Sequence, residues 1–378
     1  MENRITTLLS DLVQINSINR TLSDGPGERE IAEFAARHLT ALRLDAQVQN
    51  VGPNQCNVVA VVPGKDRHRS LLLNAHLDTV GVDGMEDPFT LRPEGDRLYG
   101  RGTYDMKGSI AIMLLLADYF TRHAPPLDIL LTLVSDEEDK STGMEYLVQK
   151  WLPQVTPAPV GGIFLEFTEE DIGVCHKGFT WYELTVTGKA AHGSRPEQGI
   201  DAILPLRSAM EELSSIQDEL QNRTPDPLLG HAAIHSSIIR GGSELSVIPS
   251  RSCFQWERRT LPDESPIDFT GELERIIQAV NNHPGDHTVK GREFFVRPPY
   301  RLPGDAEILK RLEAVTPQSR QVGLSFWADS ALAGGMGIPS ILFGPIGHGA
   351  HAIDEWVSLR SLIRVYDVLK DLIESFSE

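Results

Sequence analysis

Imidazole and carboxylate side chains follow apolar segments of this chain at several separate places. The segment SLLLNAHLD ends in His76 and Asp78, which share one side of a strand because side chains alternate with a period of two. An imidazole beside a carboxylate can close a loop with a hydrogen bond, or it can begin a metal site. His76 and Asp78 taken alone leave both interpretations open.

Further acidic and histidine side chains lie at the ends of apolar segments or in glycine-rich loops. They are Asp105 in YGRGTYDMKG, Glu137 and Glu138 in SDEED, Glu166 in GGIFLEF, and His348, His351 and Glu355 in GHGAHAIDEW. Each has an ordinary structural interpretation, such as a helix-terminal carboxylate for Asp105 or a solvated charge run for SDEED. Glu166 is harder to explain in that way, because an unpaired carboxylate inside an apolar strand is costly to bury.

The segments that carry these residues alternate between strand and helix patterns over residues 1–170. Apolar strands joined by helices predict a mostly parallel sheet, and such a sheet gathers its chemistry at the carboxyl ends of its strands. The histidines and carboxylates are therefore expected to converge on one edge, where their negative charge requires a cation. Imidazole and carboxylate without thiolate suit zinc or cobalt, and manganese less well. The ligands exceed what one zinc needs, so we predict two divalent metal ions.

The middle of the chain has a different pattern. From residue 179 the order is strand, helix, strand, strand, helix, strand, which is the split arrangement of ferredoxin-like domains. After the prolines at 298 and 299 the earlier α/β pattern returns. We therefore predict an α/β catalytic domain formed by residues 1–178 and 298–378, with an α+β domain inserted at residues 179–297.

Composition excludes some partners and favours one compartment. The 378 residues carry a formal net charge of −18, which opposes binding to nucleic acid or to an anionic membrane. Three widely spaced cysteines form neither a disulfide framework nor a metal clip, so free thiols in a reducing compartment are expected. The first residues lack the uninterrupted apolar run of a signal peptide, and no stretch is long enough to span a bilayer. We predict a cytoplasmic protein.

Five short motifs together resemble a known family. HLD at 76–78, GRGTYDMKG at 100–108, SDEE at 135–138, LEF at 165–167 and HAIDE at 351–355 are similar to the metal motifs of one group of dinuclear zinc hydrolases. That group contains acetylornithine deacetylase, succinyl-diaminopimelate desuccinylase and the bacterial glutamate carboxypeptidases. The motifs follow the family's order over nearly the whole chain. The resemblance implies a zinc exopeptidase-like catalytic domain with an inserted domain that acts as a lid and dimerises.

The resemblance also implies roles for the residues of the metal motifs. One metal ion would be held by His76 and Glu166, the other by Glu138 and His351, with Asp105 bridging them. Asp78 would accept a hydrogen bond from His76 and fix its tautomer. Glu137 would be the general base, taking a proton from a metal-bridging water and delivering it to the leaving amine. His348 competes with His351 for the ligand role, and the HxxxE spacing favours His351.

The inserted segment carries two further assignments from the resemblance. GKAAHGSRPEQGIDA is similar to a lid segment whose histidine, here His192, polarises the substrate carbonyl, in some members from the partner subunit. A plain surface turn at residues 193–196 is the alternative. Arg258 would grip the substrate's α-carboxylate, and Arg259, which points the other way on the strand, is the natural control.

The resemblance implies a small-molecule substrate, either an N-acyl amino acid or a dipeptide. Members often have asparagine where this chain has Ser246, and aspartate where it has Glu257, which leaves the carboxylate site open. GLSFWADSALAGG replaces the Gly-Gly-Thr-Ser-Asp run of desuccinylases, and Trp327 adds bulk there. We therefore favour deacylation of an N-acyl amino acid, with acetylornithine the best single candidate.

Other functions stay open beside this one. A di- or carboxypeptidase would use the same metal site, as would a succinyl-diaminopimelate desuccinylase. An inactive metal-binding module is the non-enzyme alternative, and the presence of Glu137 argues against it. Nucleotide binding is disfavoured because GRGTYDMKG lacks the Walker ending and the dinucleotide spacing. A homodimer formed through the inserted domain is expected from the resemblance.

Overall fold

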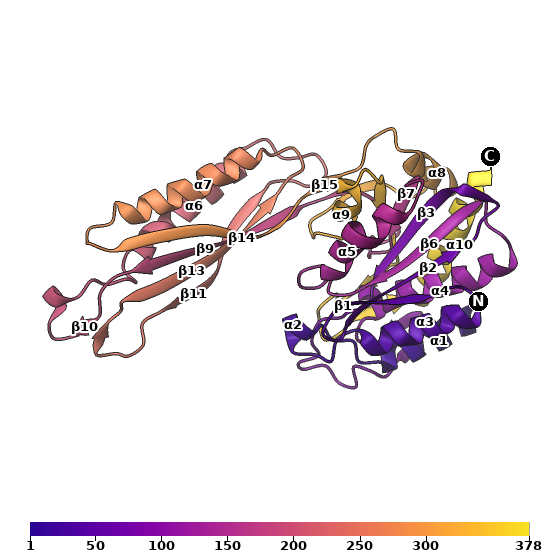
Figure 1. Cartoon of the computed structure of the whole chain (residues 1–378), viewed down its shortest axis with the longest axis horizontal. Helices are drawn as coiled ribbons and strands as arrows, with labels where there is room; N and C mark the ends of the chain where they lie inside the picture. Colours follow the sequence, from indigo (N-terminus) through magenta and orange to yellow (C-terminus); the bar gives the residue numbers. More distant parts are fainter. Residues whose placement is uncertain (378) are drawn as a thin grey trace. The chain divides into compact units, whose positions relative to one another are not determined.

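The computed structural model describes residues 1–377, with side chains at all of these positions except 266–268. The described chain forms two compact units, and Figure 1 labels many of their elements. Unit 1 contains residues 1–174, 302–322 and 328–378, and unit 2 contains residues 175–301 and 323–327. Unit 2 therefore extends beyond the 179–297 insertion at both ends and includes a short segment that follows later in the chain.

Unit 1 is built on a large twisted sheet in the order β1-β2-β6-β3-β7-β17-β8, with β16 paired to β8. β15 follows β8 in the same sheet, but its two residues belong to unit 2, as do the two residues of β8 with which they pair. The central strands β6, β3, β7 and β17 are parallel, whereas β1, β2 and β8 pair with their neighbours antiparallel. This is the mostly parallel α/β fold that the sequence predicts. The strands are β1 (Gln47–Gly52), β2 (Gln55–Val62), β3 (Asp66–His76), β6 (Leu127–Val134), β7 (Gly161–Phe164), β8 (Ile172–His176), β15 (Tyr300–Arg301), β16 (Gln321–Leu324) and β17 (Ser340–Leu342).

Helices and a small second sheet complete unit 1. The helices are α1 (Glu2–Gln14), α2 (Arg20–Ser23), α3 (Arg29–Ala41), α4 (Gly108–Arg122), α5 (Thr142–Tyr146), α8 (Glu307–Val315), α9 (Ser330–Gly335) and α10 (Leu359–Glu374). The small antiparallel sheet has the order β18-β19-β5-β4. Its strands are β4 (Arg92–Glu94), β5 (Arg97–Tyr99), β18 (Gly347–His348) and β19 (Trp356–Ser358). The sequence pattern did not predict this small sheet, because strands of two or three residues carry no periodic signal.

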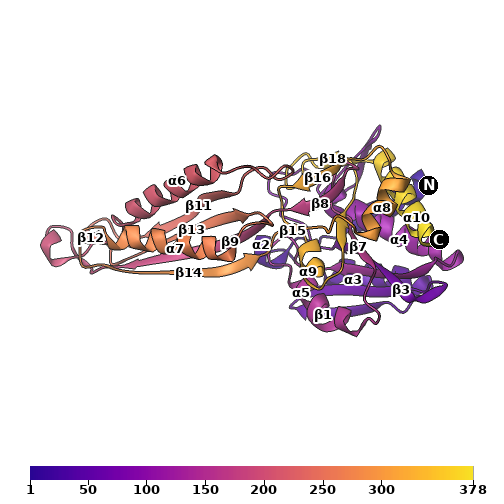
Figure 2. The ribbon, with the colours of Figure 1, turned by 90° about the horizontal axis from the view of Figure 1, so that it is seen from above.

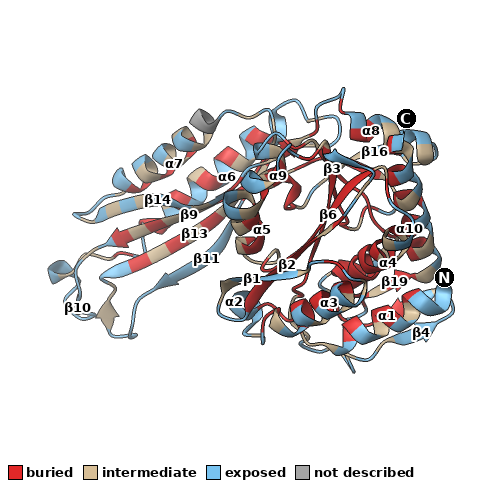
Figure 3. Cartoon of the chain, turned by 45° about the vertical axis from the view of Figure 1, so that its right-hand side comes forward, coloured by how far each residue is buried: buried red, intermediate tan, exposed pale blue. Residues whose placement is uncertain are grey.

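The core of unit 1 forms where α4 meets the central strands. Every residue of β6 is buried, and α4 is apolar nearly all round and buried along most of its length. Figure 3 shows this concentration of buried residues in β2, β3, β6 and α4. A helix that is apolar all round needs neighbours on every side, and α1, α3 and α10 pack against α4 in addition to the sheet. This packing fixes the central strands, whose carboxyl ends form one edge of the sheet.

The main sheet and the two long helices of unit 2 follow the strand and helix order that the sequence predicts for residues 179–297, and the two-residue strands β10 and β12 are additional. Its antiparallel sheet runs β11-β13-β9-β14, and α6 and α7 lie along it (Figures 1 and 2). Alternate residues of β13 are buried, and Phe254 and Trp256 pack with Leu213 and Ile216 of α6 in the core. The elements are β9 (Gly178–Thr187), β10 (Ala191–His192), α6 (Leu206–Asn222), β11 (Ala233–Gly241), β12 (Val247–Ile248), β13 (Arg251–Thr260), α7 (Pro266–Asn281) and β14 (Thr288–Arg297).

No helix within residues 1–377 is both long and apolar enough to cross a bilayer.

Candidate metal centre

The carboxyl ends of three neighbouring parallel strands carry the polar residues of the site. β3 ends at His76, and the loop after β6 carries Glu137 and Glu138. Glu166 lies two residues beyond the end of β7, rather than inside the strand as its sequence context indicated. Because β6, β3 and β7 are parallel neighbours, their ends meet at one edge of the sheet.

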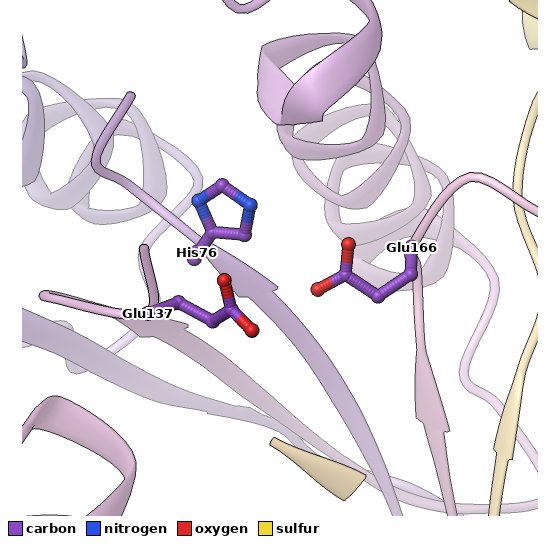
Figure 4. A group of neighbouring side chains, drawn as sticks. All are labelled: His76, Glu137 and Glu166. Carbon is purple, nitrogen blue, oxygen red and sulfur yellow. The ribbon is translucent and has the colours of Figure 1, made fainter. Parts of the chain in front are cut away.

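The side chains at this edge face one another. Single ligand atoms of His76, Glu137 and Glu166 lie within 4.8 Å of each other, and Figure 4 shows these three side chains directed toward a common point. A second group with the same property joins His76 to Asp105 and Glu138. His76 Nε2 lies 2.9 Å from Asp105 Oδ1, so the imidazole belongs to both groups.

His351 joins the second group from the loop that precedes β19. Its Nε2 lies 2.8 Å from Glu138 Oε2 and 3.3 Å from Asp105 Oδ2. His348, the competing histidine, is exposed and lies 3.6 Å from Asp354, outside both groups. Of the two histidines in the loop, the structure therefore brings His351 to the carboxylates.

Asp105 is held in place by Glu355, which the sequence pattern indicated only as the last residue of the HxxxE spacing. The buried carboxylate of Glu355 accepts hydrogen bonds from the backbone N–H groups of Gly102, Tyr104 and Asp105, at 2.8, 2.9 and 3.1 Å. It also accepts one from Arg101 Nη1 at 2.7 Å. Four donors on one carboxylate fix the glycine-rich loop, and with it the position of Asp105.

Asp78 has a different contact from the predicted one. His76 Nδ1 lies 3.0 Å from the backbone carbonyl oxygen of Asp78, but 3.5 Å from its carboxylate. The backbone carbonyl, rather than the side chain, is therefore the better acceptor for His76. The Asp78 carboxylate instead accepts the backbone N–H groups of Glu137 and Glu138, both at 3.1 Å. Asp78 thus orients the loop that carries the predicted base.

Crowding of buried carboxylates raises their affinity for protons. Burial, assisted by neighbouring acidic groups, raises the pKa of Glu138 to about 7 and that of Glu166 to about 8. Burial and the charge of Glu166 also raise the pKa of Glu137 well above its ordinary value. Asp105 goes the other way, because hydrogen bonds with His351 and His76 outweigh the effect of burial and lower its pKa. Bringing several carboxylates this close is unfavourable unless positive charge accompanies them.

The donor set fits divalent metal ions. Imidazole nitrogens and carboxylate oxygens are the ligands of zinc, cobalt and manganese sites that lack thiolate. Within the described part of the chain, Glu138 Oε1 is buried and has no hydrogen-bond partner, which leaves it available as a ligand atom. The residues that would hold the metal ions are His76, Asp105, Glu138, Glu166 and His351.

Comparison with known proteins places this site in a family. The sequence profile of peptidase family M20/M25/M40 matches residues 72–375, which include every residue of the predicted metal site. The chain belongs to this family. Membership makes it a metallohydrolase that acts on amide bonds.

Similar proteins include both deacetylases and peptidases of this family. The acetylornithine deacetylase of Buchnera aphidicola subsp. Schizaphis graminum is 25% identical over 381 residues, covering 99% of this chain and 97% of the relative. A solved tripeptidase of Staphylococcus aureus has a TM-score of 0.80 at 17% identity, with 100% and 99% coverage. A dinuclear metal binding M20 peptidase of Bacillus subtilis has a TM-score of 0.73 at 15% identity, with 99% and 98% coverage. The two structures are similar in fold.

Arg258 does not have the contacts expected of a carboxylate clamp in this M20 hydrolase. Its side chain is fully buried, and it donates to Glu264 at 2.5 Å and to Glu272 at 2.9 Å. The even-numbered residues of β13, such as Trp256, face the helices of unit 2, and Arg258 shares that face. Two acidic partners already neutralise the guanidinium, which argues against the predicted role of Arg258 in substrate binding.

Arg259, the intended control, lies on the other face of β13. About a third of its side chain is exposed, and its Nε donates to Glu257 Oε1 at 2.6 Å. Its guanidinium also lies 5.1 Å from the centre of the Phe179 ring. One acidic partner and one aromatic face orient Arg259 while leaving part of it accessible.

His192 and Trp327 also lie in unit 2. His192 is exposed on β10, with Nδ1 2.7 Å from Ser194 Oγ. Trp327 is buried, and its Nε1 donates to the carbonyl oxygen of Pro298 at 2.9 Å, so its bulk packs inside unit 2. The sequence motifs did not single out the neighbouring Asp329, which is buried in unit 1 and raises the pKa of both Glu137 and Glu166.

Proposed function

We propose that this M20 hydrolase removes the acyl group from an N-acylated amino acid, with N-acetylornithine its best single substrate. The observation that carries the proposal is that the adjacent side chains of Glu137 and Glu138 point to different groups of donor atoms. Glu138 lies beside His351 and Asp105, whereas Glu137 lies beside His76 and Glu166. One loop can therefore offer a ligand and a base to the same small volume.

Two divalent metal ions, most readily zinc, would occupy this volume. His76 and Glu166 would hold one, Glu138 and His351 the other, and Asp105 both. The B. subtilis relative is named a dinuclear metal binding peptidase, which supports the count of two. When bound, the metal ions supply Lewis acidity, which lowers the pKa of water and polarises the scissile carbonyl.

Glu137 is the proposed general base. Its carboxylate takes a proton from the attacking water and delivers it to the amine as the amide bond breaks. Burial raises the pKa of Glu137, and a carboxylate with a raised pKa is a stronger base toward the attacking water. Asp78 accepts the backbone N–H of Glu137 and so limits the movement of the loop.

Unit 2 is proposed to bind the rest of the substrate. Arg259 would pair with the α-carboxylate, supported by its accessible guanidinium and its oriented contacts with Glu257 and Phe179. His192 would polarise the carbonyl of the scissile amide, and its exposed imidazole is compatible with that role.

Unit 2 would also join two copies of the chain into a homodimer. β11 is an edge strand, and edge strands leave backbone groups free to pair with another chain. Ile239 on β11 is 53% exposed, and Leu204, just before the adjacent α6, is 61% exposed. A two-fold pairing of this surface with itself would cover both side chains.

The three cysteines are all free thiols, which supports a cytoplasmic location for the enzyme.

A peptidase is the second candidate, because the S. aureus neighbour is a tripeptidase of nearly the same length and fold. The deacetylase name of the Buchnera relative, which has the higher sequence identity, favours deacylation. The desuccinylase alternative keeps the same metal site with a different acyl group.

The test is amine release by zinc-loaded protein from a matched panel of N-acetyl amino acids, N-succinyl-diaminopimelate, dipeptides and tripeptides. The highest kcat/KM on N-acetylornithine or another N-acetyl amino acid supports the proposal. Hydrolysis of peptides alone favours the second candidate. No release from any member of the panel by protein that has bound zinc contradicts both.

A further inference from the structure

The segment between α1 and α2 ties together the loops that carry the metal centre. The carbonyl oxygen of Ile15 accepts from Lys107 Nζ at 2.7 Å, two residues beyond Asp105. The carbonyl oxygen of Ser17 accepts from the N–H of Thr79 at 3.1 Å, and the carbonyl oxygen of Thr79 accepts from the N–H of Asn19 at 2.8 Å. Residues 15–19 therefore contact both the glycine-rich loop and the segment that follows β3.

Asn19 is the residue of this segment that reaches toward the loop after β6, which carries Glu137 and Glu138 and is called the catalytic loop below. Its side chain is completely buried, and Nδ2 donates to Asp78 Oδ2 at 2.8 Å and to Asp136 Oδ1 at 3.0 Å. An amide nitrogen carries two hydrogens, so each carboxylate receives one. Asn19 thus holds two buried carboxylates side by side with a neutral donor between them.

The oxygen of the Asn19 side-chain amide also makes hydrogen bonds. Asn19 Oδ1 accepts the N–H groups of Thr21 and Leu22, both at 2.9 Å, and so caps the short helix α2. The oxygen fixes the amide plane against the backbone, and the nitrogen is thereby aimed at Asp78 and Asp136. Its orientation is set by the fold rather than by the carboxylates alone.

Asp78, which Asn19 holds in place, in turn binds the backbone of the catalytic loop. Its two carboxylate oxygens accept the backbone N–H groups of Glu137 and Glu138. Loss of the Asn19 donor would leave Asp78 and Asp136 buried and mutually repelling, and Asp78 would then move relative to those N–H groups. We propose that Asn19 is a positioning residue, which acts through Asp78 to place Glu137 and Glu138 at the metal centre.

This inference rests on the proposed function for the role of Glu137, but its test has a readout that does not. The key variant is Asn19→Asp, which keeps the oxygen that caps α2 and replaces the nitrogen that donates to Asp78. The control is Asn16→Ala in the same segment, because Asn16 Oδ1 accepts only the N–H of Ile18 among its described contacts. Both variants are compared with the wild type for kcat, KM and zinc affinity measured by chelator competition.

Residues that orient metal ligands typically change metal affinity or activity by about 10–100-fold when replaced. We expect Asn19→Asp to lower kcat and zinc affinity by about that factor with KM within about threefold, and Asn16→Ala to match the wild type. A rise in KM without a fall in kcat or zinc affinity overturns the proposal, as do wild-type values in all three. If Asn19→Asp does not fold, Asn19→Ser decides in the same way, because its hydroxyl can cap α2 but cannot donate to both carboxylates.

The zinc measurement separates this inference from the proposed function. If the wild type hydrolyses no amide in the panel, the proposed function fails, and zinc affinity alone then tests the position of Glu138. Weaker zinc binding in Asn19→Asp still supports the positioning role. Unchanged zinc binding overturns it.

Discussion

At the scale of single residues, two glutamates that are adjacent in sequence have different neighbours in the site. Glu137 and Glu138 are adjacent, yet their carboxylates belong to different groups of donors. The strand ends predicted which side chains gather at this edge, and an imidazole with several carboxylates brought together there requires a cation to offset the negative charge. Asn19 was not predictable in this way, because it lies 59 residues before Asp78 and no local pattern links the two.

The alternation along this strand favours Arg259 over Arg258 as the accessible arginine. Phe254 and Trp256 mark the even-numbered positions of RSCFQWERRT as the core face of the strand, and Arg258 shares that parity. The family resemblance alone pointed one position away. Period-two alternation is the stronger guide on a half-buried strand.

Glu137→Gln tests the proposed base. The amide keeps the shape of the side chain but cannot take a proton, so kcat should fall by about 10²–10⁴-fold, with the zinc content unchanged. Steady-state kinetics and metal analysis provide the measurement, with the exposed Glu94→Gln as the control. Activity within about tenfold of the wild type would mean that Glu137 is not the base.

Arg259→Met tests the proposed contact with the substrate carboxylate. Loss of the guanidinium should raise KM by about tenfold or more for substrates with a free α-carboxylate, because charge-assisted hydrogen bonds contribute about 1.5–3 kcal/mol. Arg251→Met, an exposed arginine on the same strand, is the matched control. Equal KM values in the two variants would argue against a role for Arg259.

At the scale of elements, the order of strands and helices was predictable and the exact ends were less so. The pattern GGIFLEF indicated a strand through Glu166, but β7 ends at Phe164, two residues before Glu166. The small sheet β18-β19-β5-β4 was missed, although β19 directly follows the HAIDE motif. These short strands depend on tertiary pairing rather than on local preference.

Glu28, at the start of α3, is an element-scale feature whose effect is measurable. It is fully buried, and within the described residues neither carboxyl oxygen has a hydrogen-bond partner. Burial, together with the charge of Asp78, raises its pKa from 4.5 to about 9. The folded state therefore binds a proton that the unfolded state releases between these two pH values.

Stability should consequently fall as pH rises from about 5 to 9, because the unfolded state binds fewer protons than the folded state in this range. Each such group contributes at most about 1.4 kcal/mol per pH unit. Glu28→Gln is neutral at every pH, so urea unfolding of the zinc-loaded variant should show a smaller decline than that of the wild type. Parallel stability curves for the two proteins would contradict a protonated Glu28.

At the scale of the whole molecule, one unit interrupts the other in sequence. The change in pattern along the chain predicted an insertion, and the ferredoxin-like order of strands and helices follows from segments of period two and 3.6. Residues 323–327 fall within the predicted α/β catalytic domain, yet they group with unit 2. These five residues are too few to carry a pattern of their own, so only contacts reveal where they belong.

The proposed dimer is tested by placing charge on the edge strand. Ile239→Lys should convert a dimer of 41.8 kDa chains into monomers, since lysine on an edge opposes pairing between chains. Light scattering coupled to size exclusion measures the mass. Val48→Lys, on the exposed edge strand β1 of unit 1, is the control and should stay dimeric. A monomeric wild type, or a dimeric Ile239→Lys variant, would exclude β11 as the interface.

The most direct test of the central claim is metal removal and replacement. Protein stripped by a chelator is titrated with zinc while amine release from the best N-acyl amino acid is followed. We predict no hydrolysis by the stripped protein and a rise that saturates at two zinc ions per chain. His76→Ala should not recover over the same zinc range, because His76 belongs to both groups of donor atoms. Undiminished hydrolysis by protein verified to be free of metal would contradict the assignment of a metal-dependent hydrolase.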